Sequence, residues 1–291
     1  MKLISRITHI RSGGRRMKMI ILRPVSQRRM KTGQRKDERG LLPGILWIHG
    51  GGYYMGMSEM VYVSVGRMLA KRFGAVVVSP EYRLAGALPG RAPYPAALRD
   101  CYAALRYMYA NAEKLGIRRD RIIVGGESAG GGLAAAVCLY ARDRGEIPVA
   151  FQLPLYPMID CEDTASSRDN HGHVWDTRHN HKGWGKYLGN LFGRGRVPKY
   201  ASPSRETDLA GMPPAYTFVS DGEPFFDETL TYVRRLREAG VEASVDVFHG
   251  DTHAFDLLLP WTRNARAAKR RLLEVFADVT RRWAEEDAAD E

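Results

Sequence analysis

The sequence is poor in cysteine and in long apolar runs, and both absences narrow what the protein can be. Three cysteines, Cys101, Cys138 and Cys161, occur in 291 residues, and none stands in a C-x-x-C pair. Neither a disulfide framework nor a cysteine-based zinc site is therefore expected. No apolar run approaches the roughly 18 residues needed to span a bilayer, and no long apolar segment follows the first charged residues as in a secretory signal. We expect a reduced, cytoplasmic protein that does not span a membrane.

Acidic residues are scarce at the start of the chain. Residues 1–40 contain thirteen Lys and Arg but only two acidic residues, whereas the remainder is balanced, so the net charge of +11 arises in this segment. Such a basic arm could bind nucleic acid. Residues 8–11 and 17–22, however, have the pattern of an edge hairpin turning at Gly13-Gly14, where positive side chains discourage aggregation. We favour the hairpin, with a solvated loop over residues 26–40, and keep nucleic-acid binding as the lesser alternative.

Short β-branched runs alternate with amphipathic stretches along most of the chain. This alternation predicts an α/β fold with a mostly parallel central sheet and helices on both faces. Residues 160–212 interrupt the rhythm, and a loop of that length without structure would be unusual. We expect this segment to be a small helical lid inserted before the last two strands, with residues 1–159 and 213–291 forming the main domain. Strands are expected at 44–48, 75–79, 121–124, 149–156, 216–219 and 243–248, and helices at 60–73, 96–115, 131–137, 228–239 and 262–285.

The segment Gly126-Glu127-Ser128-Ala129-Gly130 lies between a predicted strand and a predicted helix. A serine on such a tight turn points its hydroxyl away from the sheet, and the flanking glycines allow the strand and the helix to approach closely. G-x-S-x-G arises by chance in a chain with 30 glycines. Between this strand and this helix it predicts that Ser128 is a nucleophile.

A nucleophilic serine needs a base and also hydrogen-bond donors for the oxyanion. His49-Gly50-Gly51-Gly52 follows the strand at 44–48, and its glycines leave backbone N–H groups unscreened. We expect the amides of Gly50, Gly51 and Ala129 to converge on one oxygen. His49 is expected to brace this loop. Tyr53 and Tyr54, which follow it, are expected to line the substrate pocket, with packing in the core as the alternative.

The base is expected after the last strand. His253 follows strand 243–248 by a few residues, whereas its competitor His249 abuts the strand end and is assigned a structural role. The acid that orients the base should follow the preceding strand, where Asp227 is placed to cap the next helix and Glu228 falls in its first turn. Asp221 and Glu223 remain as the two candidates. The order serine, acid, histidine is the one expected of α/β-hydrolases.

Four of the eight histidines fall in the predicted lid, at positions 171, 173, 179 and 181. As metal ligands they would need further partners such as Asp176 in a defined geometry. We favour polar lid residues over a metal site, and we predict neither a metal nor an organic cofactor.

Taken together, these motifs resemble the hormone-sensitive-lipase-like branch of the α/β-hydrolases, which contains bacterial carboxylesterases. The resemblance runs from about residue 45 to 256. The matching stretches are residues 49–53, 82–85, 94–97, 126–131, 223–227, 239–241 and 250–255.

The resemblance implies hydrolysis of short-chain acyl esters without a cofactor, a cap over the substrate pockets, and a homodimer formed through an edge strand. Matching Pro224 to the family's proline implies that Glu223 is the triad acid. The family commonly has aspartate there, so Asp221 remains the second choice. The sequence also has Glu127 where aspartate is usual, and it begins almost at its first strand, without the N-terminal cap helices of many relatives. A more open pocket is expected.

The sequence therefore predicts a serine carboxylesterase with Ser128, Glu223 and His253 as its catalytic residues. A deacetylase or amidase that acts on a specific sugar or metabolite ester is an alternative within the enzymes. A non-catalytic ligand-binding receptor on the same scaffold is an alternative from another class. A binder can lose its histidine, whereas His253 is present here.

Overall fold

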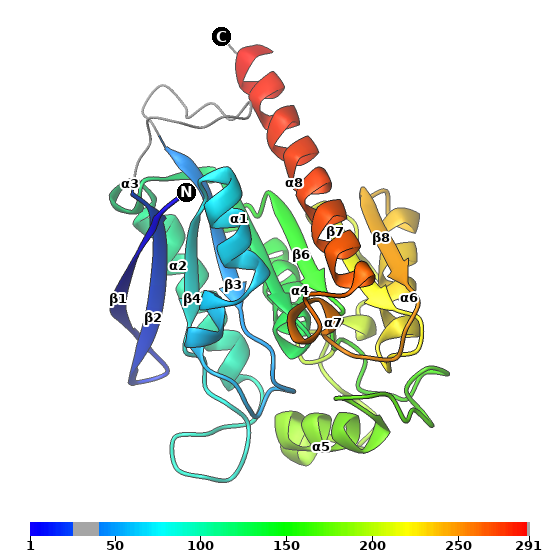
Figure 1. Ribbon diagram of the computed structural model, residues 1–291. Coiled ribbons are helices and arrows are strands. Elements are labelled where there is room, and N and C mark those ends of the chain that lie inside the picture. Colours follow the sequence, from blue (N-terminus) through cyan, green and yellow to red (C-terminus); the bar gives the residue numbers. More distant parts are fainter. Residues whose placement is uncertain (26–40, 290–291) are drawn as a thin grey trace.

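The computed structural model describes residues 1–25 and 41–289, and its centre is one twisted sheet (Figure 1). In the described residues the sheet has eight strands in the order β1-β2-β4-β3-β5-β6-β7-β8. Of the strand pairs in the described residues, only β1–β2 and β2–β4 are antiparallel. The strands are β1 (Leu3–Ser12), β2 (Arg15–Pro24), β3 (Leu42–Ile48), β4 (Val76–Pro80), β5 (Ile117–Glu127), β6 (Phe151–Leu155), β7 (Ala215–Ser220) and β8 (Ala243–Phe248).

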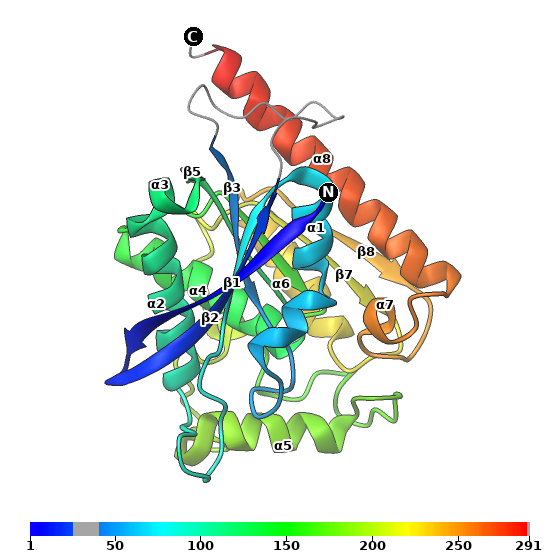
Figure 2. The same ribbon diagram turned by 60° about the vertical axis from the view of Figure 1, so that its left-hand side comes forward.

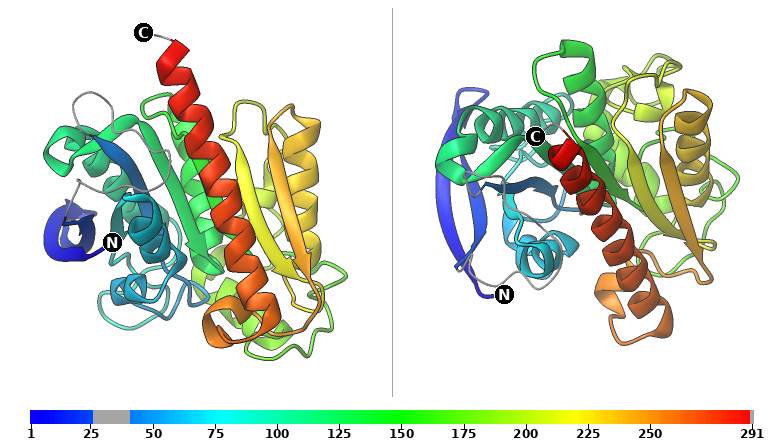
Figure 3. Two further views of the ribbon diagram at one scale, coloured as in Figure 1. Left: turned by 45° about the horizontal axis from the view of Figure 1, so that its top comes forward. Right: turned by 90° about the horizontal axis from the view of Figure 1, so that it is seen from above.

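Helices cover both faces of the sheet, because its central strands are apolar on both sides. In β5, the buried Ile122 and Val124 belong to one apolar cluster, whereas Ile123 between them belongs to the other. The first cluster includes residues of α2 (Ala96–Ala110), α3 (Ala112–Leu115), α4 (Ala129–Arg144) and α6 (Phe226–Glu238). The second includes residues of α1 (Val65–Phe73), α7 (Phe255–Leu258) and α8 (Arg263–Ala289). Figure 3 shows α8 lying along the sheet on the same side as α1. The predicted α/β class is confirmed.

Two predicted helices are divided in the structure. The stretch expected at 60–73 forms a 3₁₀ turn, η1 (Ser58–Tyr62), and then α1. The break is at Ser64, whose hydroxyl accepts a hydrogen bond from the Arg67 amide and so caps α1. The stretch expected at 96–115 is interrupted at Asn111, between α2 and α3.

The basic N-terminal segment forms the predicted hairpin at one edge of the sheet. Ile10 pairs with Met17 across β1 and β2. The turn uses Gly13 and Gly14 with φ values of 53° and 79°, a region that glycine adopts without a steric penalty. The loop predicted at residues 26–40 lies outside the described residues.

The insertion at residues 160–212 connects β6 to β7, the strand before β8. It contains α5 (Thr177–Leu188) and two 3₁₀ turns, η2 (Gly189–Leu191) and η3 (Pro203–Arg205). Figures 1 and 2 show α5 lying across the end of the sheet, near the carboxyl ends of the parallel strands. Among the described residues, none of the helices combines the length and the apolar character needed to cross a bilayer.

Candidate active site

Ser128 occupies the sharp turn between β5 and α4. Its φ of 57° and ψ of −122° are strained for a residue with a side chain. The turn is held on both sides, because the Ser128 amide donates to the Leu155 carbonyl at 3.0 Å and the Ser128 carbonyl accepts from the amides of Gly132 and Met158 at 2.9 and 3.1 Å. Ser128 is thus fixed at the N-terminus of α4, where the helix dipole favours negative charge.

The serine hydroxyl belongs to a buried hydrogen-bonded chain of three side chains. The Ser128 Oγ lies 2.8 Å from His253 Nε2, and His253 Nδ1 is hydrogen-bonded to Glu223 Oε2. The other carboxylate oxygen of Glu223 accepts from the Ser220 amide at 2.8 Å. With Nδ1–H donating to Glu223, the Nε2 lone pair faces the serine hydroxyl. In this tautomer, His253 can accept the proton of Ser128.

His249, the competitor for the base, and Asp221, the second choice for the acid, form a separate surface pair. The His249 ring, which is 97% exposed, has its Nδ1 at 2.9 Å from Asp221 Oδ2, and the Gly250 amide donates to Asp221 Oδ1 at 2.9 Å. The Gly250 amide, and next the His249 ring, lower the pKa of Asp221, and the Asp221 carboxylate in turn raises the pKa of His249. The structure thus places Glu223, and not Asp221, beside His253.

The expectation that Asp227 caps α6 is wrong. The helix begins two residues earlier than expected, at Phe226, and among the described residues no side chain caps it. Asp227 lies inside the first turn, where its carboxylate accepts from the Ser166 amide at 2.6 Å. Glu228, in the same turn, accepts from the Ile159 amide at 2.7 Å, and burial raises its pKa well above the usual range. Both acids therefore hold the beginning of the 160–212 insertion.

The glycine loop after β3 lies directly beside Ser128. A Cβ built on Gly50 would be 3.0 Å from the Glu127 carbonyl oxygen and 3.4 Å from the Ser128 Cβ. In the described part of the chain, no protein acceptor meets the amides of Gly50 and Gly51. Ala129 is the first residue of α4, a position at which the amide has no acceptor within the helix. All three predicted donors are thus free to bind a ligand oxygen.

His49 supports this loop, and within the described residues no hydrogen bond joins its ring to Ser128. Its ring stacks on Tyr82 with centroids 4.2 Å apart, and its Nδ1–H donates to the Gly50 carbonyl at 2.8 Å. Burial lowers the pKa of His49, which favours the neutral ring.

Tyr53 was expected to line the substrate pocket, and the structure shows instead the alternative arrangement, packing in the core. It is buried, stacks on Tyr187 at 4.0 Å, and donates its hydroxyl to the Met158 carbonyl at 2.5 Å. The ring of Tyr54 faces Trp175 at 6.4 Å. The ammonium groups of Lys182 and Lys186 lie 5.5 and 5.6 Å from the Tyr54 ring centroid.

Trp175 was not predicted, and it connects the insertion to the site. A Cβ on Gly52 would be 2.2 Å from the Trp175 ring, whose centroid lies 6.4 Å from that of His253. The preceding Val174 has a φ of 78°, an outlier for a β-branched residue. Next to it, the His173 carbonyl accepts from the His253 amide at 3.4 Å. The sequence shows a tryptophan in a polar stretch, but no periodic pattern that reveals its partner.

The four histidines of the insertion do not converge. Each lies against a different carboxylate: His171 against Asp169, His173 against Asp251, His179 against Asp176 and His181 against Asp163. Within residues 1–25 and 41–289, no three potential ligands gather in an arrangement that would hold a metal ion.

Two buried carboxyl groups lie behind the reacting residues. Glu127, which precedes Ser128, accepts from Trp47 Nε1 at 2.9 Å and from the Val65 amide at 3.4 Å. Burial, and then the nearby Asp256, raise the pKa of Glu127 to about 8. Asp256 accepts from the Tyr156 hydroxyl at 2.9 Å, and burial raises its pKa to about 6. Glu127 therefore retains its proton at neutral pH.

Comparison with known proteins shows the family and the fold of the chain. A family described as having the alpha/beta hydrolase fold matches residues 45–257. The chain is an α/β-hydrolase of the hormone-sensitive-lipase-like branch. Esterase LipI of Mycobacterium tuberculosis is 34% identical over 205 residues, which cover 70% of this chain and 62% of LipI, so the match spans less than two thirds of that relative. Carboxylesterase NlhH of the same organism is 33% identical over 230 residues, which cover 76% of this chain and 70% of NlhH.

Solved structures extend the similarity to almost the whole α/β-hydrolase chain. A bacterial heroin esterase superposes with a TM-score of 0.82 at 34% identity, covering 95% of this chain and 85% of the other. The esterase of Pyrobaculum calidifontis gives a TM-score of 0.80 at 31% identity, covering 97% and 85%. The predicted fold and family are thereby confirmed.

The buried Glu127 predicts a pH-dependent stability. Its folded-state pKa of about 8 lies above the ordinary value of 4.5. Between pH 4.5 and pH 8, the native state therefore holds a proton on Glu127 that the unfolded chain has released. Stability from this group is complete below pH 4.5 and is lost as the pH rises to 8. Glu127→Gln removes the titration, so its unfolding free energy relative to wild type should rise from pH 5 to 8, by at most about 1.4 kcal/mol per pH unit.

Urea unfolding of both proteins at pH 5, 6, 7 and 8 measures this difference. Glu113→Gln, at an exposed glutamate of α3, is the matched control. A Glu127→Gln difference that stays constant with pH would contradict the assignment of a raised pKa to this group.

Proposed function

We propose that this protein is a serine carboxylesterase that hydrolyses short-chain acyl esters through an acyl-enzyme intermediate. The observation that carries the proposal is the buried chain Ser128–His253–Glu223, placed beside the amides of Gly50 and Gly51, which have no acceptor among the described residues. The esterase and carboxylesterase names of the relatives support the same class of reaction.

In the first half of the proposed reaction, Ser128 Oγ attacks the ester carbonyl carbon while His253 Nε2 takes the hydroxyl proton. The carbonyl oxygen becomes an oxyanion, which the amides of Gly50, Gly51 and Ala129 stabilise by hydrogen bonds. The bond between carbon and the alcohol oxygen then breaks, and His253 returns the proton to the leaving alcohol. Glu223 holds the imidazole tautomer and stabilises the imidazolium that forms.

In the second half, a water molecule takes the place of the alcohol. His253 removes one of its protons as the water oxygen attacks the acyl carbon, and the same three amides hold the second oxyanion. The bond to Ser128 Oγ breaks, and the serine regains its proton from His253. The products are one alcohol and one carboxylic acid, and the enzyme returns to its starting state.

We further propose that residues 160–212 act as a cap over this site. The support is Trp175, whose ring lies on Gly52 and faces His253. An indole in this position fills space next to the glycine loop, which favours a short acyl group. Opening of the cap would have to move the strained Val174 and the His173 carbonyl, which accepts a hydrogen bond from the His253 amide.

The cellular location and the oligomeric state of the protein are also proposals. A cytoplasmic location rests on the three cysteines, none of which is in a disulfide. A homodimer through an edge strand rests on the family resemblance.

The esterase proposal predicts that activity depends on the Ser128 hydroxyl. Ser128→Ala should lower kcat/KM for p-nitrophenyl acetate by at least about 1,000-fold, because nucleophile and base act as one unit. A series of p-nitrophenyl esters from acetate to decanoate, run on both proteins, measures the loss and the acyl preference, with the shortest esters expected to react fastest. Equal rates for the two proteins would rule out the proposed reaction.

The assignment of the acid predicts unequal effects of two similar substitutions. Glu223→Gln should lower kcat far more than Asp221→Asn, since Glu223 is hydrogen-bonded to His253 whereas the Asp221 carboxylate is hydrogen-bonded to the exposed His249 and to the Gly250 amide. A loss of about 100-fold or more is expected for Glu223→Gln and less than about threefold for Asp221→Asn. Steady-state kinetics on the same ester decide the matter, and a larger loss in the Asp221 variant would reverse the assignment.

A further inference from the structure

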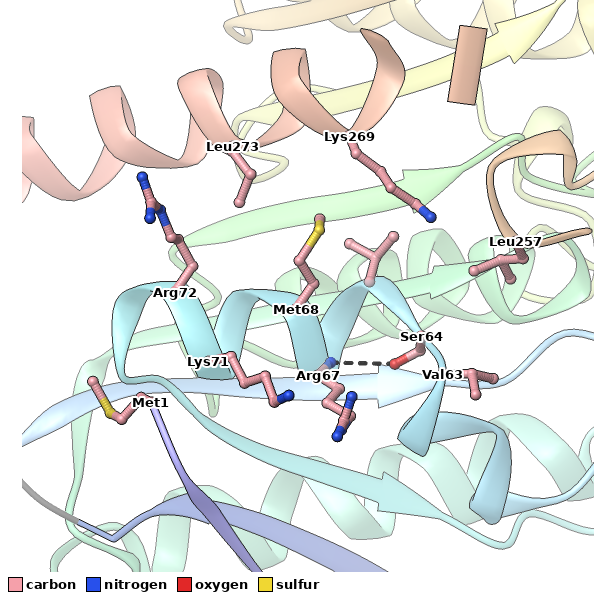
Figure 4. A pocket seen from close by; sticks show the side chains of 11 residues that line it. Met1, Val63, Ser64, Arg67, Met68, Lys71, Arg72, Leu257, Lys269 and Leu273 are labelled. Carbon is pink, nitrogen blue, oxygen red and sulfur yellow. Dashed lines mark hydrogen bonds between the residues drawn. The ribbon is translucent and has the colours of Figure 1, made fainter. Parts of the chain in front are cut away.

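A groove lies between α1 and α8, on the face of the sheet that these helices cover. In Figure 4, Met68 of α1 and Leu273 of α8 point toward each other across it, and Leu257 stands at one end. Met68 and Leu273 are partly buried against the apolar cluster of this face. The groove has a volume of about 440 Å³, within the range of roughly 300–1,000 Å³ that is usual for small-molecule sites. None of the three proposed catalytic residues lines it.

Four cationic side chains line the groove: Arg67, Lys71 and Arg72 of α1 and Lys269 of α8. In Figure 4, Arg72 and Lys269 border the apolar floor between the helices, whereas Arg67 and Lys71 extend from the other side of α1. The groove has no acidic lining residue, and among the described residues none of the four cations has a carboxylate at ion-pair distance.

Some other cations of α8 are paired with carboxylates, whereas Arg263, Arg266 and Arg270 have no carboxylate at ion-pair distance among the described residues. Arg271, two residues from Lys269, pairs with Glu274 at 2.7 Å and lies 3.4 Å from Asp246.

Lys269 interacts electrostatically with the buried Asp256. Among the described residues, the charges of Arg67, Lys71 and Arg72 have no carboxylate partner, and an anion in the groove would relieve the mutual repulsion of the cations.

An apolar floor with a cationic border matches one kind of molecule, which has an anionic head and an apolar tail. The tail would displace water from Met68 and Leu273, and the head would reach Lys269 or Arg72. A bilayer surface fits less well, because its headgroups form a broad layer whereas the floor is recessed between two helices. The exposed Trp261, on the segment between α7 and α8, is the feature that a bilayer would use instead.

We propose that the groove between α1 and α8 binds a single-chain amphiphilic anion of the fatty-carboxylate class. The site is separate from Ser128, and the proposal does not depend on the esterase reaction. Its ligand is a free molecule, and the bilayer is one of the outcomes of the test.

The test is titration calorimetry of the full chain with sodium decanoate at low ionic strength. The groove variant is Arg72→Gln with Lys269→Gln, and the matched control is Arg271→Gln with Arg282→Gln. The control removes the same amount of charge at two arginines that already have acidic partners. Decanoate should bind the wild type and the control with affinities within twofold, and the groove variant at least tenfold more weakly. Acetate, which lacks the tail, and decyltrimethylammonium, which lacks the negative charge, should each bind the wild type at least tenfold more weakly.

Equal decanoate affinity in the wild type and the groove variant would overturn the proposal, because binding would then occur elsewhere, the proposed active site included. Absence of decanoate binding to the wild type would overturn it as well. A third outcome would assign the surface to a bilayer instead. In that outcome the wild type co-sediments with phosphatidylglycerol vesicles but does not bind decanoate, and the groove variant does not co-sediment. Near-ultraviolet circular dichroism verifies that the variants are folded. If the groove variant does not fold, Met68→Glu replaces it, because this substitution places a negative charge on the floor of the groove.

Discussion

The backbone contact between β3 and the start of α4 is the constraint on which the site depends. A Cβ on Gly130 would lie 2.1 Å from the Ile48 carbonyl oxygen, and one on Gly126 would lie 2.5 Å from the same oxygen. Strand and helix therefore touch without side chains between them. Since β3 continues into the glycine loop, this contact sets the separation between Gly50 and Ser128. A methyl group at either glycine would push the proposed oxyanion donors away from the proposed nucleophile.

Burial of carboxyl groups is the second organising feature of the site. One buried carboxylate is hydrogen-bonded on both oxygens, and two other buried carboxyl groups have raised pKa values. Glu223 is fully buried and has a partner on each oxygen, the Ser220 amide and the His253 ring. Glu127 and Asp256 lie deep behind the site with raised pKa values, because burial disfavours their charged forms. A proton on Glu127 limits the negative charge next to Ser128, where the proposed reaction develops an oxyanion.

Most of the proposed site could be predicted from the sequence, because its parts lie at strand ends that the fold brings together. The strand-to-helix turn at Ser128, the glycines at 50–52 and the histidine after the last strand each have a local signal. Parallel pairing of β3, β5, β6, β7 and β8 then places their carboxyl ends at the same end of the sheet. The remainder depends on contacts between distant segments. Trp175 has no periodic partner in the sequence, and the role of Asp227 changed because the insertion, through Ser166, occupies the start of α6.

The central claim is that His253 activates Ser128 to form a covalent acyl-enzyme. Its most direct test is mass spectrometry of the protein after brief reaction with a p-nitrophenyl alkylphosphonate, which leaves a stable adduct on an activated serine. The account predicts one adduct per chain, on the peptide that contains Ser128, forming at least about 100-fold more slowly in His253→Ala. An adduct on another residue, or equal rates in the two proteins, would contradict it.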